Sequence, residues 1–424
     1  MTIMNIVNLL NNRSIRNGGL FSIFSFFTRG ISFVLIMLLA KYISPNEYGE
    51  LSLFNTFVMF LGYFVGLSSA GYLSVSFFKK TDDDFYKDFT AIIIITVLVT
   101  ITLLLLSLTF SSWLSDMLRI PIPLIFVGLF ISFFDTFVQL NLDYLRVQEK
   151  ISWYGVLSCT FALVNFVITL YLVINKNLNW RGRVYAQFLC EVIFFLIALT
   201  YFIKRGLFVL PKKWIYYRTI LFWGIPLIPH LAANWMKQGL DRYFISGFHD
   251  MADVGLFSFS FNLANIIIIV GVAFNQTNSV SIYRILSNVD ISKEQKWANL
   301  KKKERIFLSV YTILALAIAI GGTILVPIVI PQYIASIPYF WILSCFGLAQ
   351  CVYFVFCNYL FYYDKTRQLM YITFGLAILH VLLSYIFTRY SLYYTCIISV
   401  ISQLIITLLV YVKSNRVLRN NLLK

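Results

Sequence analysis

FWGIPLIPHLAANWMKQGLDR, residues 222–242, is apolar enough to lie in a membrane, yet it carries a row of polar side chains. Four of these recur at helical spacing and would form one stripe on an α-helix: His230, Asn234, Lys237 and Asp241. A charged side chain near the bilayer centre costs roughly 2.5–3.5 kcal/mol, so we expect the stripe to face a polar interior rather than lipid. Pro226 and Pro229 remove backbone donors, which predicts a bent or broken helix with these two residues as its hinge.

The composition of the whole chain indicates a membrane protein. Of its 424 residues, 60% are hydrophobic and only 12% are charged, whereas about a quarter of the residues of a soluble domain are charged. Apolar runs of about 20 residues, the length of a transmembrane helix, recur throughout, and no strand-like alternation accompanies them. The predicted fold class is therefore an all-α polytopic membrane protein.

Twelve apolar spans can be identified along the chain. Their approximate bounds are 17–39, 51–78, 89–112, 122–145, 152–174, 184–203, 217–240, 254–278, 306–330, 334–361, 369–388 and 391–412. Six spans fall in each half, which predicts two six-helix bundles, residues 1–210 and 211–424, around a central cavity.

The placement of lysine and arginine tests this topology. With the N-terminus in the cytoplasm, 25 of the 34 basic residues fall on the cytoplasmic side and seven on the other, while Arg29 and Lys237 lie within spans. Cytoplasmic loops of membrane proteins carry an excess of basic residues, so both termini are expected inside. The same placement accounts for most of the formal charge of +16 without nucleic acid as a partner.

A short internal repeat links the two halves. KYISPNEYGELSLFN, residues 41–55, and RYFISGFHDMADVGLFSFSFN, residues 242–262, each contain an Ile-Ser step, a short loop, a glycine and a serine three residues later. The glycines are Gly49 and Gly255 and the serines are Ser52 and Ser258, so the offset is 206 residues. Because six spans make up each half, both copies have the same orientation, as in transporters built from parallel repeats.

Basic residues inside the spans are candidates for contact with a substrate. Arg29 lies near mid-membrane, with more than ten mostly apolar residues on each side, and Lys237 belongs to the polar stripe. One interpretation is a cationic cavity for an anionic substrate, because guanidinium groups suit forked contacts with phosphate. The other is a structural ion pair of either residue with Asp135 or Asp241.

Other polar residues in the spans are candidates for lining the cavity or coupling transport to an ion. They are Asp135, Gln139, Glu191, His230, Asn234 and Asp241. Glu191 would either carry a proton or sodium ion or form a structural pair. His230 would either titrate near neutral pH or be held by interior hydrogen bonds next to the proline kink.

The sequence contains no motif for bond-making chemistry or for a cofactor. There is no Walker-type nucleotide motif, so pumping would draw on an ion gradient or a substrate gradient. The three histidines are too scattered for a metal site, and the six cysteines lie in apolar segments without a CxxC motif. We therefore expect a transporter without cofactor or metal, and not an enzyme.

Two blocks of sequence carry a family resemblance. LLAKYISPNEYGELSLFNTF, residues 38–57, and GIPLIPHLAANWMKQGLDRYFISGFHDMADVGLFSFSF, residues 224–261, resemble the polysaccharide flippases of bacterial inner membranes, the Wzx-type O-antigen translocases. The second block has a GxPLxP start, a DR-aromatic-Phe-Ile step and a VGLYS-like continuation. These motifs point to the multidrug/oligosaccharidyl-lipid/polysaccharide exporter superfamily, and twelve spans favour its O-antigen branch over the lipid II flippases.

The resemblance implies a substrate and a mechanism. Two bundles would alternate between inward- and outward-open states and move an undecaprenyl-pyrophosphate-linked oligosaccharide from the cytoplasmic to the periplasmic leaflet, driven by protons or sodium. The implied location is the bacterial inner membrane, and the implied partners include the polymerase and chain-length proteins of the same pathway. Arg29 and Lys237 match the basic cavity of the family by their position in the spans, and Arg242 belongs to its DRYF motif.

Two alternatives stay open. A multidrug exporter of small cationic compounds would have the same fold, but acidic residues should then dominate the cavity. A membrane enzyme of polysaccharide assembly would need a large external catalytic loop, and none is predicted between the spans.

Overall fold

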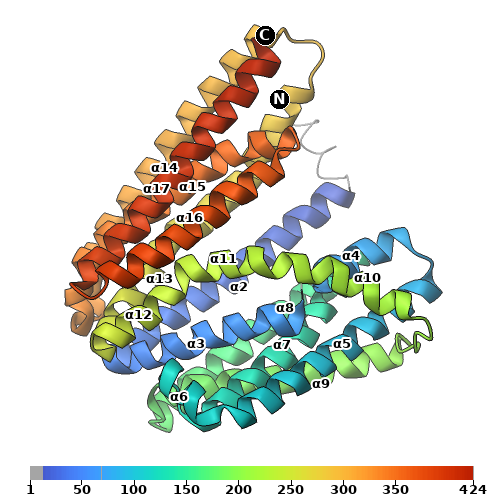
Figure 1. Ribbon diagram of the computed structural model, residues 1–424, viewed down its shortest axis with the longest axis vertical. Helices are drawn as coiled ribbons and strands as arrows, with labels where there is room; N and C mark the ends of the chain where they lie inside the picture. The colour runs from blue at the N-terminus through green and yellow to red at the C-terminus, as the bar shows by residue number, and fades with distance from the viewer. Residues whose placement is uncertain (1–12, 68, 424) are drawn as a thin grey trace. The chain divides into compact units, whose positions relative to one another are not determined.

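The computed structural model describes residues 13–67 and 69–423, and this part of the chain is helical and contains no β-strand (Figure 1). The elements in chain order are α2 (Arg13–Tyr42), α3 (Pro45–Gly66), α4 (Ser69–Lys79), α5 (Asp82–Thr109), α6 (Ser111–Leu118), α7 (Ile122–Val147), α8 (Ile151–Leu170), η1 (Tyr171–Asn175), α9 (Asn179–Lys204), α10 (Trp214–Gly224), η2 (Ile225–Leu227), α11 (Ile228–Gln238), α12 (Leu240–Phe248), α13 (Met251–Ser287), α14 (Lys293–Val329), η3 (Pro331–Ser336), α15 (Ile337–Tyr362), α16 (Thr366–Phe387) and α17 (Leu392–Leu422). The predicted all-α fold class is confirmed.

Most of these helices are long enough to cross a membrane. Within the described ranges, 11 helical segments have the length and apolar composition of a membrane span, because a hydrocarbon core about 30 Å thick needs roughly 20 helical residues. Every predicted span except 217–240 coincides with one of these segments. The chain is therefore a multi-pass membrane protein.

The predicted span 217–240 is not one helix. A turn of 3₁₀-helix, η2, separates α10 from α11 and contains Pro226, and Gly239 separates α11 from α12. Proline has no amide hydrogen to donate and its ring crowds the preceding turn, so the α-helical ladder cannot run unbroken through this point. α10 and α11 have 11 residues each, too few to span a membrane alone. The break predicted from Pro226 and Pro229 is thus present.

Backbone contacts divide the chain into two compact units. Unit 1 contains Met1–Ile43 and Leu53–Ala232, and unit 2 contains Ser44–Ser52 and Ala233–Lys424. α10, from the C-terminal half of the sequence, thus packs in unit 1, whereas the start of α3 packs in unit 2. The chain passes between the units within α3 and again within α11. The division at residues 210 and 211 stays a prediction.

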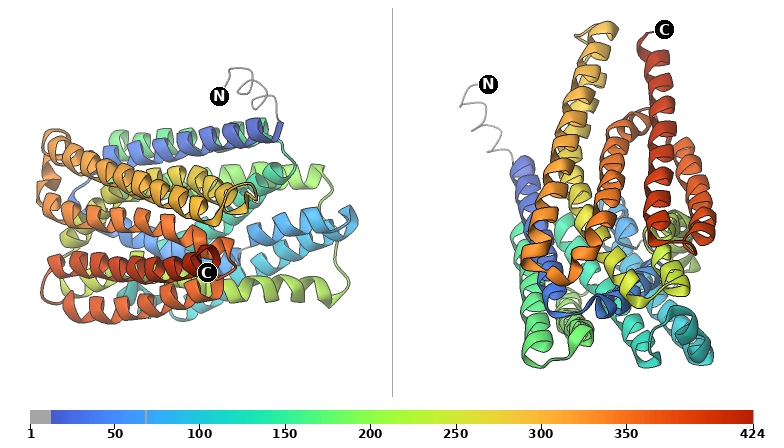
Figure 2. Two further views of the ribbon diagram at one scale, coloured as in Figure 1. Left: turned by 90° about the horizontal axis from the view of Figure 1, so that it is seen from above. Right: turned by 90° about the vertical axis from the view of Figure 1, so that its left-hand side faces the viewer.

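Each unit has its own core. In unit 1, aromatic side chains of α5, α7 and α9 pack together, with ring centroids 5.8 Å apart for Phe85 and Tyr144 and 4.8 Å apart for Phe89 and Phe202. In unit 2, α13, α15 and α17 lie side by side (Figures 1 and 2) and bury small and branched side chains such as Cys351. These cores hold the helices that position the polar residues described next.

Candidate functional site

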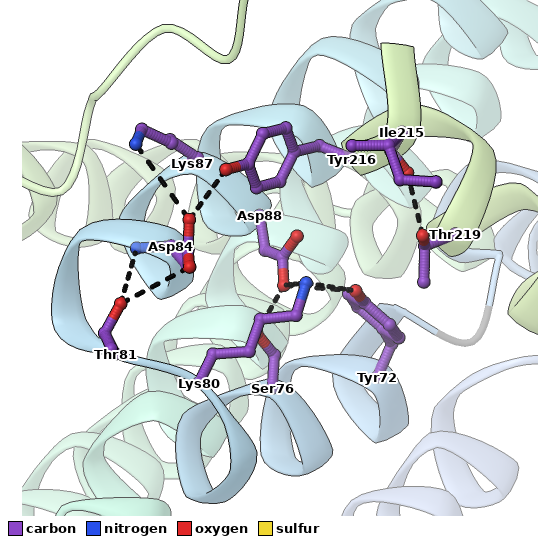
Figure 3. A network of polar contacts seen from close by, with 10 residues as sticks. All are labelled: Tyr72, Ser76, Lys80, Thr81, Asp84, Lys87, Asp88, Ile215, Tyr216 and Thr219. Atoms are coloured by element: carbon purple, nitrogen blue, oxygen red, sulfur yellow. Dashed lines mark hydrogen bonds and ion pairs between the residues drawn. The ribbon is translucent and has the colours of Figure 1, made fainter. Parts of the chain in front are cut away.

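α10, the first part of the broken span, is fixed within unit 1 by a polar network (Figure 3). Lys80, in the turn between α4 and α5, has its ammonium 2.7 Å from the carboxylate of Asp88 and donates to the hydroxyl of Tyr72 at 3.3 Å. Tyr216 of α10 donates to Asp84 of α5 at 2.6 Å. The Lys80 ammonium also lies 5.5 Å from the ring centroid of Tyr216. The network therefore joins α4, α5 and α10.

The charge pair at the centre of this network is partly buried. The Asp88 side chain is 1% exposed and the Lys80 side chain 31%, and the hydroxyl of Ser76 donates to the same Asp88 oxygen at 2.5 Å. Burial acts to lower the pKa of Lys80, but the bonds to Asp88 and Tyr72 outweigh it and raise that pKa. Lys80 therefore stays charged, and sequence analysis missed the pair because Lys80 looked like an ordinary loop cation.

Replacing Lys80 by methionine is expected to destabilise the protein by about 2–3 kcal/mol, because a buried carboxylate then keeps only hydroxyl donors. Thermal unfolding of the purified protein would show a drop of several degrees. Lys87→Met is the matched control, since the Lys87 ammonium pairs with an Asp83 side chain that is 69% exposed and exposed pairs contribute little. Equal unfolding temperatures for the two variants would contradict a stabilising role for Lys80.

α12, the last part of the broken span, is fixed within unit 2 by a second polar cluster. The Asp241 carboxylate is 1% exposed and accepts hydrogen bonds from Ser384 at 2.5 Å and from Ser399 at 3.0 Å. His380 Nε2 lies 3.2 Å from Asp241 Oδ1, and His380 Nδ1 lies 3.2 Å from the hydroxyl of Ser402. We call Asp241, His380, Ser384, Ser399 and Ser402 the Asp241 cluster.

The Asp241 cluster continues toward a partly exposed histidine. Ser384 lies 3.4 Å from the hydroxyl of Thr388, and His249 Nε2 donates to the carbonyl oxygen of Thr388 at 2.5 Å. His249 Nδ1 lies 4.0 Å from Asp253, and their side chains are 19% and 35% exposed. Thr388, which follows α16, thus contacts the Asp241 cluster through its hydroxyl and His249 through its carbonyl oxygen.

Arg242 is held inside unit 2 as well. Its Nε donates to Ser258 at 3.1 Å and to Ser52 at 2.8 Å, and its guanidinium also donates to the carbonyl oxygen of Gln238. The guanidinium carbon lies 5.1 Å from the ring centroid of Phe261. These contacts use the guanidinium within the protein, which favours a structural role for Arg242 over contact with a substrate.

The two copies of the internal repeat meet in unit 2. Ser52 donates to Ser258 at 2.7 Å, so residues at equivalent places in the two copies contact each other. The backbones approach closely here: a Cβ on Gly49 would lie 2.2 Å from the carbonyl oxygen of Met251, and a Cβ on Gly255 would lie 1.8 Å from that of Pro45. Contact between equivalent residues is what a two-fold axis between the copies requires, which supports the predicted repeat.

α11 carries the remaining residues of the predicted stripe. Lys237 is half-buried, and within the described residues no ion pair forms between Lys237 and Asp241, whose oxygens are used by the Asp241 cluster. The backbone of His230 and Asn234 belongs to α11, but their side chains lie outside what the structure describes.

Arg29 is exposed on α2, and the described part of unit 1 contains no ion pair between Arg29 and Asp135. Among the described residues of each unit, the structural pairs considered from the sequence are therefore not formed.

The acidic candidates of unit 1 lie on α7 and α9. Asp135 accepts a hydrogen bond from Gln139 at 3.0 Å. Glu191 is buried, and its Oε2 has no hydrogen-bond partner among the described residues. Arg183 of α9 donates to the side chain of Asn165 at 2.5 Å. Val138 of α7 and Cys190 of α9 pack in one hydrophobic cluster, so these acidic candidates lie on two helices that pack together.

Comparison of the sequence with known proteins identifies a matching family and a relative. Residues 14–280 match the family described as polysaccharide biosynthesis protein. The Lsg locus protein 1 of Haemophilus influenzae is 25% identical over 346 residues, which cover 80% of this chain and 82% of that protein. The family match over residues 14–280 includes the whole of the broken span.

Solved structures share the fold. An inward-facing multidrug resistance transporter of the MATE family in the MOP superfamily has a TM-score of 0.74 at 12% identity, covering 92% of this chain and 94% of that one. The lipid II flippase MurJ in an inward closed conformation also has a TM-score of 0.74, at 14% identity, covering 93% and 87%. With a family match over more than half of its length and this fold, the chain belongs to the polysaccharide biosynthesis protein family.

Proposed function

We propose that this protein is a flippase that moves an undecaprenyl-pyrophosphate-linked oligosaccharide across the bacterial inner membrane, from the cytoplasmic to the periplasmic leaflet. Family membership and the likeness to transporters of the MOP superfamily support this class of substrate. The glycan and pyrophosphate of such a substrate cannot enter hydrocarbon without losing their hydrogen bonds to water, so they need a polar path through the protein. The polyprenyl tail can stay in the lipid.

The observation that carries the proposal is the cation on α11. Lys237 lies on a short helix between two anchored segments and has no carboxylate partner within the described residues of unit 2. A half-buried cation without a carboxylate partner is costly in a membrane protein unless a ligand or water compensates it. Pyrophosphate is the part of the proposed substrate that would do so. Arg29 is a separate candidate cation in unit 1.

The broken span supports alternating access. The Lys80 network holds α10 in unit 1, and the Asp241 cluster holds α12 in unit 2. α11, with the prolines at its start, connects these anchored ends, so a change in the relation of the two units would be taken up there. This proposal includes a moving hinge at Pro226 and Pro229, in addition to the fixed break that they make in the helix.

The Asp241 cluster is the proposed site of coupling to protons. The carboxylate and the His380 imidazole are 3.2 Å apart, and either can hold a proton. The charged and titratable groups around them are Arg242 on α12, His249 and Asp253 near the start of α13, and Cys396 on α17.

Replacing Arg29 or Lys237 by alanine is expected to lower surface polysaccharide tenfold or more, since truncating one partner of a desolvated charged contact costs about 2–5 kcal/mol. The measurement is surface polysaccharide in a strain that lacks the chromosomal gene and carries each variant, with protein amount determined by immunoblot. Lys302→Ala is the matched control, because Lys302 is an exposed cation on the polar first part of α14. Normal polysaccharide in the Lys237→Ala strain would refute the substrate-site assignment.

A second candidate function is export of small cationic compounds. The buried Glu191, with one oxygen free of hydrogen bonds within the described residues, is the observation that favours it. Under this alternative, Glu191→Gln would abolish resistance to cationic dyes in a sensitive strain, whereas the flippase proposal expects no such resistance from the wild-type protein.

A further inference from the structure

The C-terminal part of α17 carries an open groove outside the Asp241 cluster. Its volume is about 610 Å³, within the roughly 300–1,000 Å³ of typical ligand sites. Its polar and end residues follow one stripe of the helix: Tyr411, Asn415, Arg416, Arg419, Asn420 and Leu423. The opposite face of the same segment is buried in the core of unit 2, including Val410, Leu418 and Leu422. The helix is therefore fixed with this stripe outward, and we call the stripe the α17 groove.

The α17 groove offers hydrogen-bond donors and positive charge. Arg416 and Arg419 are exposed one helical turn apart, and neither forms an ion pair within the described residues. Lys301 donates to Asn415 Oδ1 at 2.8 Å and is itself bound to Glu304 at 2.7 Å. Because the amide oxygen of Asn415 faces Lys301, its nitrogen keeps its N–H donors for another ligand. Two guanidinium groups with adjacent amides match a phosphate group.

The depth of the α17 groove matches the level of lipid headgroups. The apolar part of α17, residues 392–412, is about 31 Å long, the thickness of the hydrocarbon core. Arg416 and Arg419 therefore lie about 6–10 Å beyond its edge, where phosphates are found. Ser414 donates to the carbonyl oxygen of Phe356 near the end of α15, and the end of α17 projects past the turn between α15 and α16 (Figure 2).

We propose that the α17 groove binds the phosphate of an anionic phospholipid in the leaflet on the side of the C-terminus. Both guanidinium groups contact the phosphate, the amides of Asn415 and Asn420 donate to the headgroup, and Tyr411 packs against the upper part of the acyl chains. The occupant is a bulk lipid of the membrane, so this site does not depend on the proposed transport function.

The test uses the purified full chain in detergent, with thermal unfolding and native mass spectrometry as readouts of added phosphatidylglycerol. Arg416→Gln/Arg419→Gln is expected to weaken phosphatidylglycerol binding about tenfold to thirtyfold, since each cation near an anionic headgroup is worth about a factor of five. Lys302→Gln/Arg305→Gln removes the same charge from exposed positions of α14 and is expected to leave binding unchanged. Arg416→Lys/Arg419→Lys keeps the charge without the forked contacts and is expected to give an intermediate loss.

Three results would overturn the proposal. The first is an equal loss in the α14 control, which would mean adsorption to a basic surface. The second is binding of zwitterionic phosphatidylethanolamine as tight as that of phosphatidylglycerol. The third is displacement of phosphatidylglycerol by inorganic pyrophosphate at similar concentrations, which would assign the α17 groove to a polyphosphate instead of a phospholipid.

Discussion

The Ser52→Cys/Ser258→Cys double variant is expected to lose all transport when its two new thiols are oxidised and to regain it on reduction. The two side chains face each other, with their hydroxyl oxygens 2.7 Å apart in a hydrogen bond, so cysteines at these positions would have their thiols in contact. A bond here would tie the start of α3 permanently to α13. Both residues lie in unit 2, so the bond would fix the shared end of α3 within that unit.

The expected loss of transport follows from the division of α3 between the two units. Ser44–Ser52 belong to unit 2, while the rest of α3 belongs to unit 1. The proposed alternation requires the halves of the protein to separate on one side and close on the other. The Ser52–Ser258 contact, the close approach of Gly49 and Gly255, and the Arg242 contacts form a junction inside unit 2. We propose that this junction opens in one of the two states, because the rest of α3 belongs to the other unit.

The experiment measures surface polysaccharide in cells that carry the double variant in a Cys345→Ala background, since Cys345 is an exposed native thiol. The predicted topology places the junction near the periplasm, where disulfides form. Each single cysteine variant, and the double variant grown with a reductant, should transport normally. Full transport by a protein shown to be crosslinked would mean that the junction is a permanent pivot and does not open.

The helices and their approximate limits could be predicted from the sequence because a membrane span needs about 20 apolar residues, whatever its neighbours are. The break at Pro226 was predictable for a similar reason, since the missing amide hydrogen acts within one turn. The repeat around Gly49 and Gly255 was visible as well. The contact between the two copies through Ser52 and Ser258 could be recognised only from the structure.

The candidate site was predictable only in part. Asp241 stood out as a charge in an apolar span, but its partners are 139 to 158 residues away along the chain. His380 and Ser384 are four residues apart, and so are Thr395 and Ser399, so a helical polar stripe was present in each of the last two spans. Isolated hydroxyl side chains are common packing residues in membrane helices. Ser384 and Ser399 differ from them because both donate to the Asp241 carboxylate.

The exchange of segments between the units was not predictable from span counting. α10 follows the sixth span in the sequence, and the bond from Tyr216 to Asp84 joins it to α5 in unit 1. A short helix at the boundary between two bundles can pack against either of them, and contacts between side chains decide which one it joins. Counting apolar spans along the sequence does not detect such side-chain contacts.

Asp241→Asn is expected to reduce transport by tenfold or more while leaving the protein folded. The amide keeps the size of the carboxylate and can still accept from Ser384 or Ser399, so the packing of α12 against α16 and α17 is retained. The amide cannot take up a proton, so the Asp241–His380 pair loses its carboxylate.

The discriminating measurement for Asp241→Asn is transport in vesicles as the outside pH is varied. If the Asp241–His380 pair binds the coupled proton, the wild-type rate should depend on the pH gradient and the residual rate of the variant should not. Glu304→Gln is the matched control, because Glu304 is a buried carboxylate of the same unit that is bound to Lys301 and Tyr359. That variant should unfold at a lower temperature and keep the dependence on the pH gradient. If Asp241→Asn keeps this dependence too, the cluster only anchors α12, and the buried Glu191 of unit 1 becomes the carboxylate to test for coupling.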